Sequence, residues 1–396
     1  MSRGRIFFYV QHLLGIGHLR RAAAIARGLA REGFAVAFVS GGEPPPGLDL
    51  GGAEIRQLPP ARAGDPGFAS IVDAGGRPID DAWRAQRRQA LLEAFADAAP
   101  DIVLIELYPF GRRPFRFELQ PLLAAAAARQ PRPAVACSVR DILVDRNDPQ
   151  REAEIIAIIR RSFDRVLVHG DPRLVPFEAT FPGAREIADR LRYTGYVVNE
   201  APAGARSAAG EGEILVSAGG GAVGAPLLWA ALAARPLTRV AEKPWRLITG
   251  PNLGGAEFER LTAAAPRGVA VERFRDDFQA LLRNCHVSVS QAGYNTVMEL
   301  LVARTRAVVV PFAEGNETEQ PLRSRLLAER GLLTVVEPAS LTPASLAAGI
   351  DVACLAAPPA IGSIDVAGVA GTVRAIDDLL GVRARAAAGG RNAVLR

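Results

Sequence analysis

Residues 11–21, QHLLGIGHLRR, bring two histidines, two glycines and two arginines into one short stretch that could bind or activate a substrate. The stretch follows the apolar run RIFFYV and precedes the alanine-rich run AAAIARGLA, so it connects a predicted strand to a predicted helix. His18 then falls in the first helical turn, at the carboxyl end of a parallel strand, where ligands of α/β sheets bind. Because a helix N-terminus disfavours imidazolium, we expect a neutral His18 that can accept a proton. A histidine that only caps the helix is the alternative, and His12 fits a structural role.

A second glycine-rich turn follows the strand-like run EILVSA. Gly219, Gly221 and Gly224 match the GxGxxG pattern between a strand and a helix. A dinucleotide site also needs an acidic residue at the end of the next strand, but that strand, WRLITG, ends at Gly250, which disfavours an NAD-dependent oxidoreductase. No lysine closes the loop as a P-loop requires. Two readings stay open: backbone N–H groups that bind an anion at the helix N-terminus, or a tight turn without a ligand.

Composition restricts the class of protein. The chain has 396 residues, enough for two domains, and no uninterrupted apolar run long enough to cross a membrane or serve as a signal peptide. Its three cysteines are far apart, which argues against a disulfide framework or structural zinc and favours the cytoplasm. Of the 47 basic residues only one is lysine, but 42 acidic residues nearly balance them, so we expect no nucleic-acid partner.

Alternating β-branched and alanine- or leucine-rich runs predict an α/β fold with parallel sheets. In the first half we expect strands near 5–10, 35–39, 102–105, 134–138 and 164–168, helices near 18–31, 82–98, 115–128 and 151–162, and loops over 41–80. A polar break at 199–212 precedes six further predicted strands, EILVSA, WRLITG, GVAVE, HVSVS, RAVVVP and LLTVV. The sequence therefore predicts two Rossmann-like, doubly wound domains, 1–200 and 201–380, followed by a flexible tail over 381–396.

A distinctive pattern lies in the second domain. A predicted strand runs into the small polar loop SQAG, and a helix carrying Glu299 follows. The next strand ends at Pro311, after which Glu319 and Gln320 precede another helix. Upstream, the RFRDDF segment joins a strand to a helix that we expect Asp276 or Asp277 to cap.

Together these motifs resemble the C-terminal domain of family 28, the MurG-like GT-B glycosyltransferases. The SAGGG loop and the GIGHLRR turn fit the same family, whereas residues 41–200 resemble it poorly. The resemblance implies two Rossmann-like domains facing across a cleft, with a nucleotide-sugar donor held mainly by the second. It also assigns roles. Glu299 would bind the ribose, and Glu319 and Gln320 would bind the sugar. The other donor-binding residues would be Gly219, Gly220, Gly221, Phe274, Arg275, Ser290, Ala292, Gly293, Tyr294 and Asn295.

On the acceptor side the resemblance makes His18 the residue that takes the hydroxyl proton. Glu106, at the end of a buried strand, is the second catalytic candidate. An aromatic–arginine loop follows it, and its arginines could bind an acidic or phosphorylated acceptor or simply be solvated. The acceptor-side candidates are Gly15, Gly17, Arg112, Arg113 and Arg140.

The sequence thus predicts an inverting, metal-independent glycosyltransferase that moves a GlcNAc-type sugar from a UDP-sugar to a hydroxyl. The four histidines are scattered, so we expect neither a metal site nor a cofactor beyond the UDP-sugar co-substrate. The acceptor would be a small molecule, a glycan or a lipid-linked group, and the arginines would permit peripheral contact with the inner face of the membrane. The alternatives are a nucleotide-sugar epimerase or hydrolase, in which Glu106 or Glu319 would act on the sugar, and a non-catalytic nucleotide-sugar-binding protein.

Overall fold

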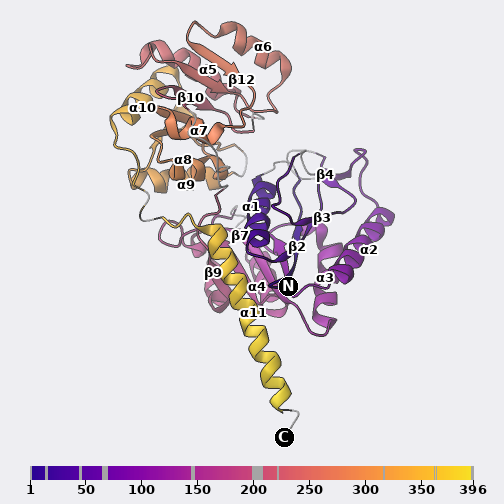
Figure 1. Cartoon of the computed structure of the whole chain (residues 1–396). Helices are drawn as coiled ribbons and strands as arrows, with labels where there is room; N and C mark the ends of the chain where they lie inside the picture. Colours follow the sequence, from indigo (N-terminus) through magenta and orange to yellow (C-terminus); the bar gives the residue numbers. More distant parts are fainter. Residues whose placement is uncertain are drawn as a thin grey trace. The chain divides into compact units, whose positions relative to one another are not determined.

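A computed structural model of the chain describes residues 2–13, 17–43, 47–64, 70–143, 148–198, 208–220, 223–314, 317–360, 362 and 364–393 (Figure 1). Beyond residue 381 it describes the backbone only. The chain forms two compact units, Met1–Val197 with Asp365–Arg396, and Val198–Ile364. Each unit is built on one parallel sheet, as the sequence predicts.

The first unit contains a seven-stranded sheet in the order β3-β2-β1-β6-β7-β8-β9, with parallel pairing throughout. Its strands are β1 (Arg5–Val10), β2 (Ala35–Ser40), β3 (Glu54–Gln57), β6 (Ile102–Glu106), β7 (Ala134–Arg140), β8 (Arg165–His169) and β9 (Leu191–Tyr193). The helices that cover it are α1 (Gly17–Arg31), α2 (Asp81–Ala98), α3 (Arg116–Ala128), α4 (Pro149–Ser162) and α11 (Gly368–Ala393).

The alternation of side chains along each strand gives this sheet two apolar faces. On β1, Phe7 and Tyr9 pack in the cluster that includes residues of α2, α3 and α4. Phe8 and Val10 point the other way and pack with residues of α1 and α11. The sheet is therefore buried on both sides, which explains why its strands are almost uniformly apolar.

The second unit contains a six-stranded parallel sheet in the order β12-β11-β10-β13-β14-β15. Its strands are β10 (Ile214–Ser217), β11 (Trp245–Ile248), β12 (Val269–Glu272), β13 (Val287–Gln291), β14 (Ala307–Val310) and β15 (Thr334–Val335). The helices are α5 (Ala225–Ala234), α6 (Gly255–Ala264), α7 (Phe278–Asn284), α8 (Tyr294–Ala303), α9 (Glu319–Glu329) and α10 (Pro343–Leu355). The strand order reverses between β10 and β13, so their carboxyl ends flank the switch point at which open α/β sheets bind ligands.

All six strands predicted for this unit are present, and so are the five strands predicted for the first half. The expectation of loops over 41–80 is wrong: this stretch contains β3 and an antiparallel hairpin of β4 (Ala61–Ala63) and β5 (Ile71–Asp73). β3 is largely exposed, and β4 and β5 have only three residues each, so none of them contains the apolar run that reveals a buried strand. The expected helix cap is also incomplete. Asp277 stands at the N-cap position of α7, but its carboxylate binds Arg275 instead of a backbone N–H.

The C-terminal end of the chain also differs from the prediction. We expected the second domain to reach residue 380 and a flexible tail to follow, but α11 begins at Gly368, packs on the first unit and continues to Ala393. Its close approach depends on glycine. A Cβ atom on Gly28 of α1 would lie 2.1 Å from a methyl group of Val369, and one on Gly371 would lie 1.9 Å from the carbonyl oxygen of Thr194. Among the described residues, no helix is both long and apolar enough to cross a bilayer.

We predict that Gly371→Ala destabilises the first unit by about 1–3 kcal/mol, the usual range for overpacking. The obstacle is a backbone oxygen, which cannot rotate away, so α11 must shift. Urea denaturation followed by circular dichroism measures the loss. Gly255→Ala on α6 is the control, because no atom lies within 4 Å of its added methyl group. Equal stability of the two variants would contradict the close packing of α11.

Candidate functional site

His18 lies in the first turn of α1, the helix that follows β1 in the sequence. Its Nδ1 atom is 2.9 Å from Oε1 of Glu106, the last residue of β6, which neighbours β1 in the sheet. The His18 side chain is 23% exposed, whereas that of Glu106 is fully buried. The two catalytic candidates of the sequence are thus in direct contact, with the histidine between the buried carboxylate and solvent.

Glu106 receives three hydrogen bonds from side chains. Oε1 accepts from His18 and from the fully buried guanidinium of Arg21, and Oε2 accepts from the Ser138 hydroxyl at 2.5 Å. Burial alone would raise the pKa of Glu106, but Arg21, His18 and Ser138 hold it well below its usual range. Glu106 is therefore ionised. Because a carboxylate can only accept, Nδ1 of His18 carries the hydrogen and Nε2 keeps its lone pair.

Three arginines surround the histidine. Burial, together with the charges of Arg140, Arg112 and Arg21, lowers the pKa of His18 to about 3 against the opposing hydrogen bond to Glu106. Arg112 stands in the turn after β6, and its buried Nε atom has no hydrogen-bond partner among the described residues. With one carboxylate against three guanidinium groups, the surroundings of His18 favour a negatively charged ligand.

The other acceptor-side candidates separate into different environments. Arg113 is exposed, and its charge acts on Glu154 of α4. Gly17 begins α1, whereas Gly15 lies outside the described residues. Of the predicted acceptor-side arginines, the structure thus brings Arg112 and Arg140 to His18.

Sequence analysis missed two residues of this group, Arg21 and Ser138. Arg21 was noticed in the GIGHLRR stretch without a role, and helical spacing from His18 to Arg21 puts both on one face of α1. Ser138 pairs with Glu106 in the register of β6 and β7. A sequence signal for Ser138 exists: it is a polar residue near the carboxyl end of a strand whose preceding residues on the same face are apolar.

In the second unit, the loop after β10 starts with Gly219, whose φ of +62° is the left-handed conformation that glycine adopts without strain. Gly220 follows, and Gly221 lies outside the described residues. The third glycine of the pattern has a packing role, because a Cβ atom on Gly224 would lie 2.2 Å from Cβ of Ala218. A Cβ atom on Gly219 would meet no atom within 4 Å, so the first part of this loop is open, next to the switch point of the sheet.

The SQAG segment lies on the other side of that switch point, with Ser290 and Gln291 at the end of β13 and Ala292 and Gly293 before α8. Ser290 and Ala292 are fully buried, and the Ser290 hydroxyl lies 3.0 Å from that of Ser288. Gly293 is the N-cap residue of α8, and no side chain caps the helix there. Asn295 and Glu299 follow in the first two turns, both half-buried. A helix N-terminus without a side-chain cap can bind the phosphates of a ligand through its backbone N–H groups.

Three predicted donor residues contribute to the packing of α8 and α9. Arg323 is fully buried, binds the carboxylate of Glu319 at 2.7 Å and stacks over the ring of Tyr294. Gln320 accepts a hydrogen bond from the backbone N–H of Phe312 through its side-chain oxygen. The Glu319 carboxylate is thus held by a buried counter-charge, and its contact with a sugar hydroxyl stays a prediction.

The RFRDDF turn connects β12 to α7. Phe274 is 59% exposed, whereas Arg275 binds Asp277 and lies 3.6 Å from Glu272. The backbone of this turn is fixed by a hydrogen bond from the Gly250 N–H to the carbonyl oxygen of Arg273. An exposed aromatic ring on a fixed turn at the carboxyl edge of the sheet can contact a flat ligand group such as a nucleobase.

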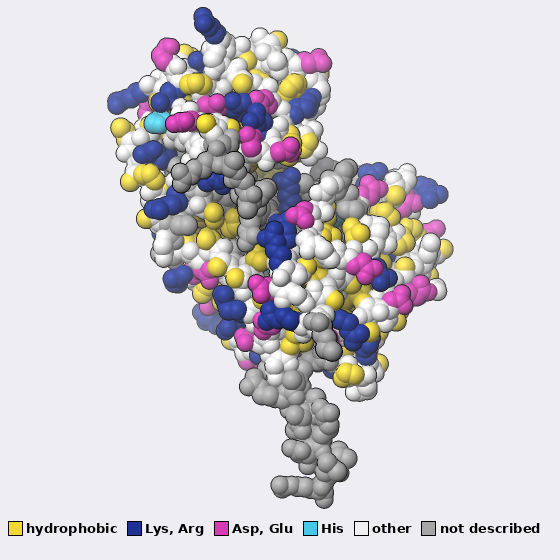
Figure 2. Space-filling view, viewed as in Figure 1, with side chains coloured by type: hydrophobic (Ala, Val, Ile, Leu, Met, Phe, Trp, Pro, Cys, Tyr) yellow, Lys and Arg dark blue, Asp and Glu magenta, His cyan; other side chains and the backbone are white. Residues whose placement is uncertain are grey.

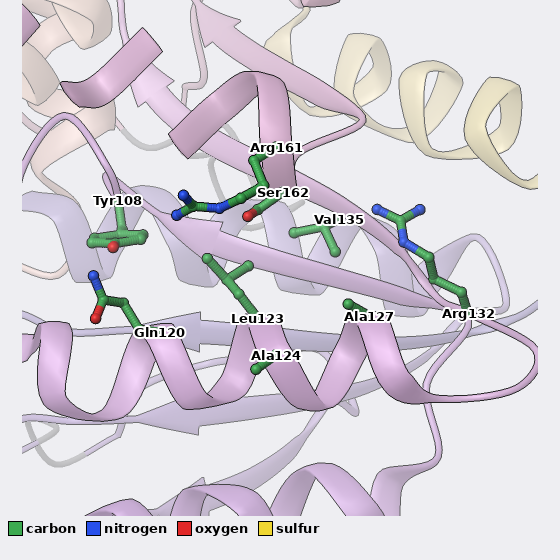
Figure 3. Close-up of a pocket in the computed structure, with 9 residues that line it drawn as sticks. All are labelled: Tyr108, Gln120, Leu123, Ala124, Ala127, Arg132, Val135, Arg161 and Ser162. Carbon is green, nitrogen blue, oxygen red and sulfur yellow. The ribbon is translucent and has the colours of Figure 1, made fainter. Parts of the chain in front are cut away.

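A surface pocket of about 420 Å³ lies between α3 and α4 of the first unit (Figure 3). Leu123 and Val135 form its apolar floor, and the guanidinium of Arg161 extends over it. Both floor residues belong to the core opposite α1, so the sheet separates this pocket from His18. On the visible surface, basic and acidic side chains are interspersed (Figure 2). Within the described part of the chain, no group of three or more His, Cys, Asp or Glu side chains could hold a metal ion.

Comparison with known proteins places this geometry in a family. Residues 218–358, which contain the glycine loop, the RFRDDF turn and the SQAG loop, match the glycosyltransferase family 28 C-terminal domain. The second unit thus matches the C-terminal domain of glycosyltransferase family 28. The chain is 33% identical over 160 residues to the UDP-N-acetylglucosamine–N-acetylmuramyl-(pentapeptide) pyrophosphoryl-undecaprenol N-acetylglucosamine transferase of Thiobacillus denitrificans, a match over 39% of this chain and 43% of the relative. The chain therefore spans less than half the length of the curated relatives it matches.

The family 28 assignment agrees with the fold of the whole chain. MurG of Acinetobacter baumannii superimposes with a TM-score of 0.60 and 16% identity over 94% of this chain and 99% of its own. The calicheamicin glycosyltransferase CalG4 gives a TM-score of 0.59 and 17% identity over 100% and 99%. The two units therefore have the GT-B fold that the sequence predicts.

We predict that the His18 ring stays neutral at pH values far below about 6.5, the ordinary pKa of histidine. An NMR titration of the labelled ring should give a midpoint below pH 4, because burial and three arginines oppose the proton. The unfolded chain takes up that proton below about pH 6.5 and the folded chain does not, so His18 lowers folding stability as the pH falls through this window. A midpoint near 6.5 would contradict the buried arrangement.

Proposed function

We propose that the protein is a glycosyltransferase that uses His18 as a general base. The observation that carries the proposal is the contact between the partly buried ring of His18 and the buried, ionised carboxylate of Glu106. This contact puts the hydrogen on Nδ1 and leaves Nε2 able to take a proton. The family 28 C-terminal domain supports the same proposal independently.

In the proposed reaction, a hydroxyl oxygen of the acceptor attacks the anomeric carbon of a nucleotide-sugar. The bond from that carbon to the diphosphate breaks, and the electron pair leaves with the diphosphate. The hydroxyl proton passes to Nε2 of His18, and Glu106 stabilises the imidazolium that forms. Attack opposite the leaving group inverts the anomeric carbon. Backbone N–H groups at Gly293 and in the loop at Gly219 would stabilise the diphosphate charge, so we propose a metal-independent reaction.

The donor we propose is a UDP-sugar of the GlcNAc type. The curated relatives named above transfer N-acetylglucosamine from UDP-N-acetylglucosamine, and they match this chain at 28–33% identity over about 160 residues. Glu299, in the second turn of α8, would accept hydrogen bonds from the ribose hydroxyls. Phe274 would lie against the base. Because Glu319 is bound to Arg323, Gln320 is the better candidate for a contact with the sugar.

For the acceptor we propose a molecule that carries an anionic group next to its reacting hydroxyl. Arg112 and Arg140 act on the His18 ring, and guanidinium groups bind phosphates and carboxylates in a bidentate manner. The relatives act on a pyrophosphoryl-undecaprenol acceptor, whose diphosphate has this chemistry. A small molecule, a glycan and a lipid-linked group all remain within this class.

The geometry favours the transferase over an epimerase or hydrolase on the same fold. Such an enzyme needs a carboxyl group that can exchange protons beside the anomeric carbon. Glu106 is fully buried and held ionised by Arg21, and Glu319 is held by Arg323. Neither carboxylate is available for that step. A non-catalytic nucleotide-sugar-binding protein would not require the His18–Glu106 contact, and the His18 variant described below distinguishes it.

We predict that calorimetry with UDP, GDP, dTDP and NAD shows preferential binding of UDP, equally with Mg²⁺ and with a chelator. Glu299→Gln should weaken UDP binding about 10- to 100-fold, because a hydrogen bond to a charged group contributes about 1.5–3 kcal/mol. The matched control is Glu259→Gln on the exposed surface of α6, which should leave binding unchanged. If none of the four nucleotides binds, all the roles proposed for the donor-binding residues are wrong.

We predict that His18→Ala lowers turnover about 10²- to 10⁴-fold, the usual contribution of a general base, with little change in UDP affinity. Radiolabelled sugar transfer to extracted acceptors measures turnover, and calorimetry measures affinity. Arg20→Ala, two residues away on the exposed side of α1, serves as the control. Unchanged turnover in His18→Ala would exclude His18 as the base.

A further inference from the structure

The hydrogen bonds of Glu106 continue into the first unit beyond Ser138. The Ser138 Oγ atom lies 2.9 Å from Nε2 of His169, the last residue of β8. Nδ1 of His169 lies 2.8 Å from the hydroxyl of Thr194, just after β9. All of these groups except His18 are buried, and each comes from a different strand or its end. A continuous chain of side chains thus runs across β6, β7, β8 and β9 and ends at His18.

Each group in this chain has a fixed number of hydrogens, which determines the direction of every bond. The ionised Glu106 can only accept, so the single hydroxyl hydrogen of Ser138 points to its Oε2. The contact between Ser138 and His169 then needs a hydrogen on Nε2 of His169. Burial, together with the charge of Arg21, lowers the pKa of His169 to about 3, so the ring is neutral and its Nδ1 is an acceptor. The Thr194 hydroxyl lies 2.8 Å from this Nδ1, closer than to its two other acceptors, the carbonyl oxygens of Gly195 at 3.2 Å and Val168 at 3.4 Å, so we assign its hydrogen to Nδ1.

We propose that Ser138, His169 and Thr194 are positioning residues, which hold Glu106 in the orientation that keeps the hydrogen of His18 on Nδ1. The donors run in one direction, from Thr194 to His169, then to Ser138 and to Glu106. The chain supplies Oε2 with its hydrogen bond, so that Oε1 stays directed at His18 and Arg21. The proposal rests on the role of His18 in the proposed function, but the hydrogen positions can be measured without any reaction.

A carboxylate that lost this support would have two ways to relax. It could rotate its Oε2 toward Arg21, or it could take up a water in place of the Ser138 hydroxyl. Either change loosens the Nδ1 contact of His18 and lets the ring carry its hydrogen on Nε2. The ring would then present a donor where the reaction needs an acceptor.

The first test measures the tautomers directly. The chain has four histidines, so ¹⁵N-histidine labelling of the full-length protein gives few signals, and single His→Gln variants assign them. Protonated and bare nitrogens of a neutral imidazole have well-separated ¹⁵N shifts. We expect the hydrogen on Nδ1 in His18 and on Nε2 in His169. A hydrogen on Nδ1 of His169, or a charged His169 ring at pH 7, would overturn the proposal.

The second test removes single hydrogen bonds from this series of side chains, at residues that do not contact His18. Ser138→Ala and Thr194→Val should shift the His18 signals toward the Nε2–H form and lower kcat about 10-fold, part of the general-base contribution. The KM for the donor should not change. Thr194→Ser keeps the hydroxyl and should restore both readouts. His169→Gln keeps a donor in place of Nε2 and should be less affected than His169→Leu.

Loss of packing alone is controlled by Val139→Ala. Val139 is fully buried on β7, next to Ser138 in sequence but on the opposite face of the sheet. This variant should lose stability without changing the His18 tautomer. If Ser138→Ala behaved like Val139→Ala in the NMR spectrum, the chain would be structural only. If the wild-type tautomers were as expected but no transfer occurred, the proposed function would fail while the hydrogen-bond directions would hold.

Discussion

A carboxylate that is buried and ionised must receive enough hydrogen bonds to replace the water it has lost. In the first unit, Glu106 meets this requirement with three donors on two elements: His18 and Arg21 on α1 and Ser138 on β7. This one carboxylate therefore fixes the position of α1 relative to the ends of β6 and β7. The neutral state of His18 depends on the same group, because Arg21 balances the carboxylate while the charges of Arg112 and Arg140 oppose a proton on the His18 ring.

Much of the fold could be predicted from the sequence, because both sheets are parallel and covered on both faces. Their strands are therefore apolar runs, as in IVLIE and RVLVH, that stand out between helices. The short strands β3, β4 and β5 contain no such apolar run. Helix α11 is a different case. Its apolar stripe is readable, but nothing in a stripe says which sheet it covers, and the partner proved to be the first unit and not the second.

The residues of the candidate site could be predicted only where all the evidence for them lies within one short stretch of sequence. His18 was found because a helix start, two glycines and a strand end coincide in eleven residues. Ser138 and His169 were missed because their significance arises from contacts between strands separated by about thirty residues of chain. In the second unit the family pattern located the loops correctly along the sheet edge. It could not show that Arg323 forms an ion pair with Glu319, since that pairing depends on the burial of an arginine one helical turn away.

The return of α11 to the first unit has a consequence for how the protein is made. The α1 side of that unit, with Ile25 and Leu29, is completed by Ile376 and Leu379, which lie beyond the entire second unit in the sequence. During synthesis, the ribosome therefore releases all of residues 198–364 before the first unit can close its apolar surface. The unit that is translated first is the one that finishes folding last, and until then its exposed face is where aggregation or chaperone binding would occur.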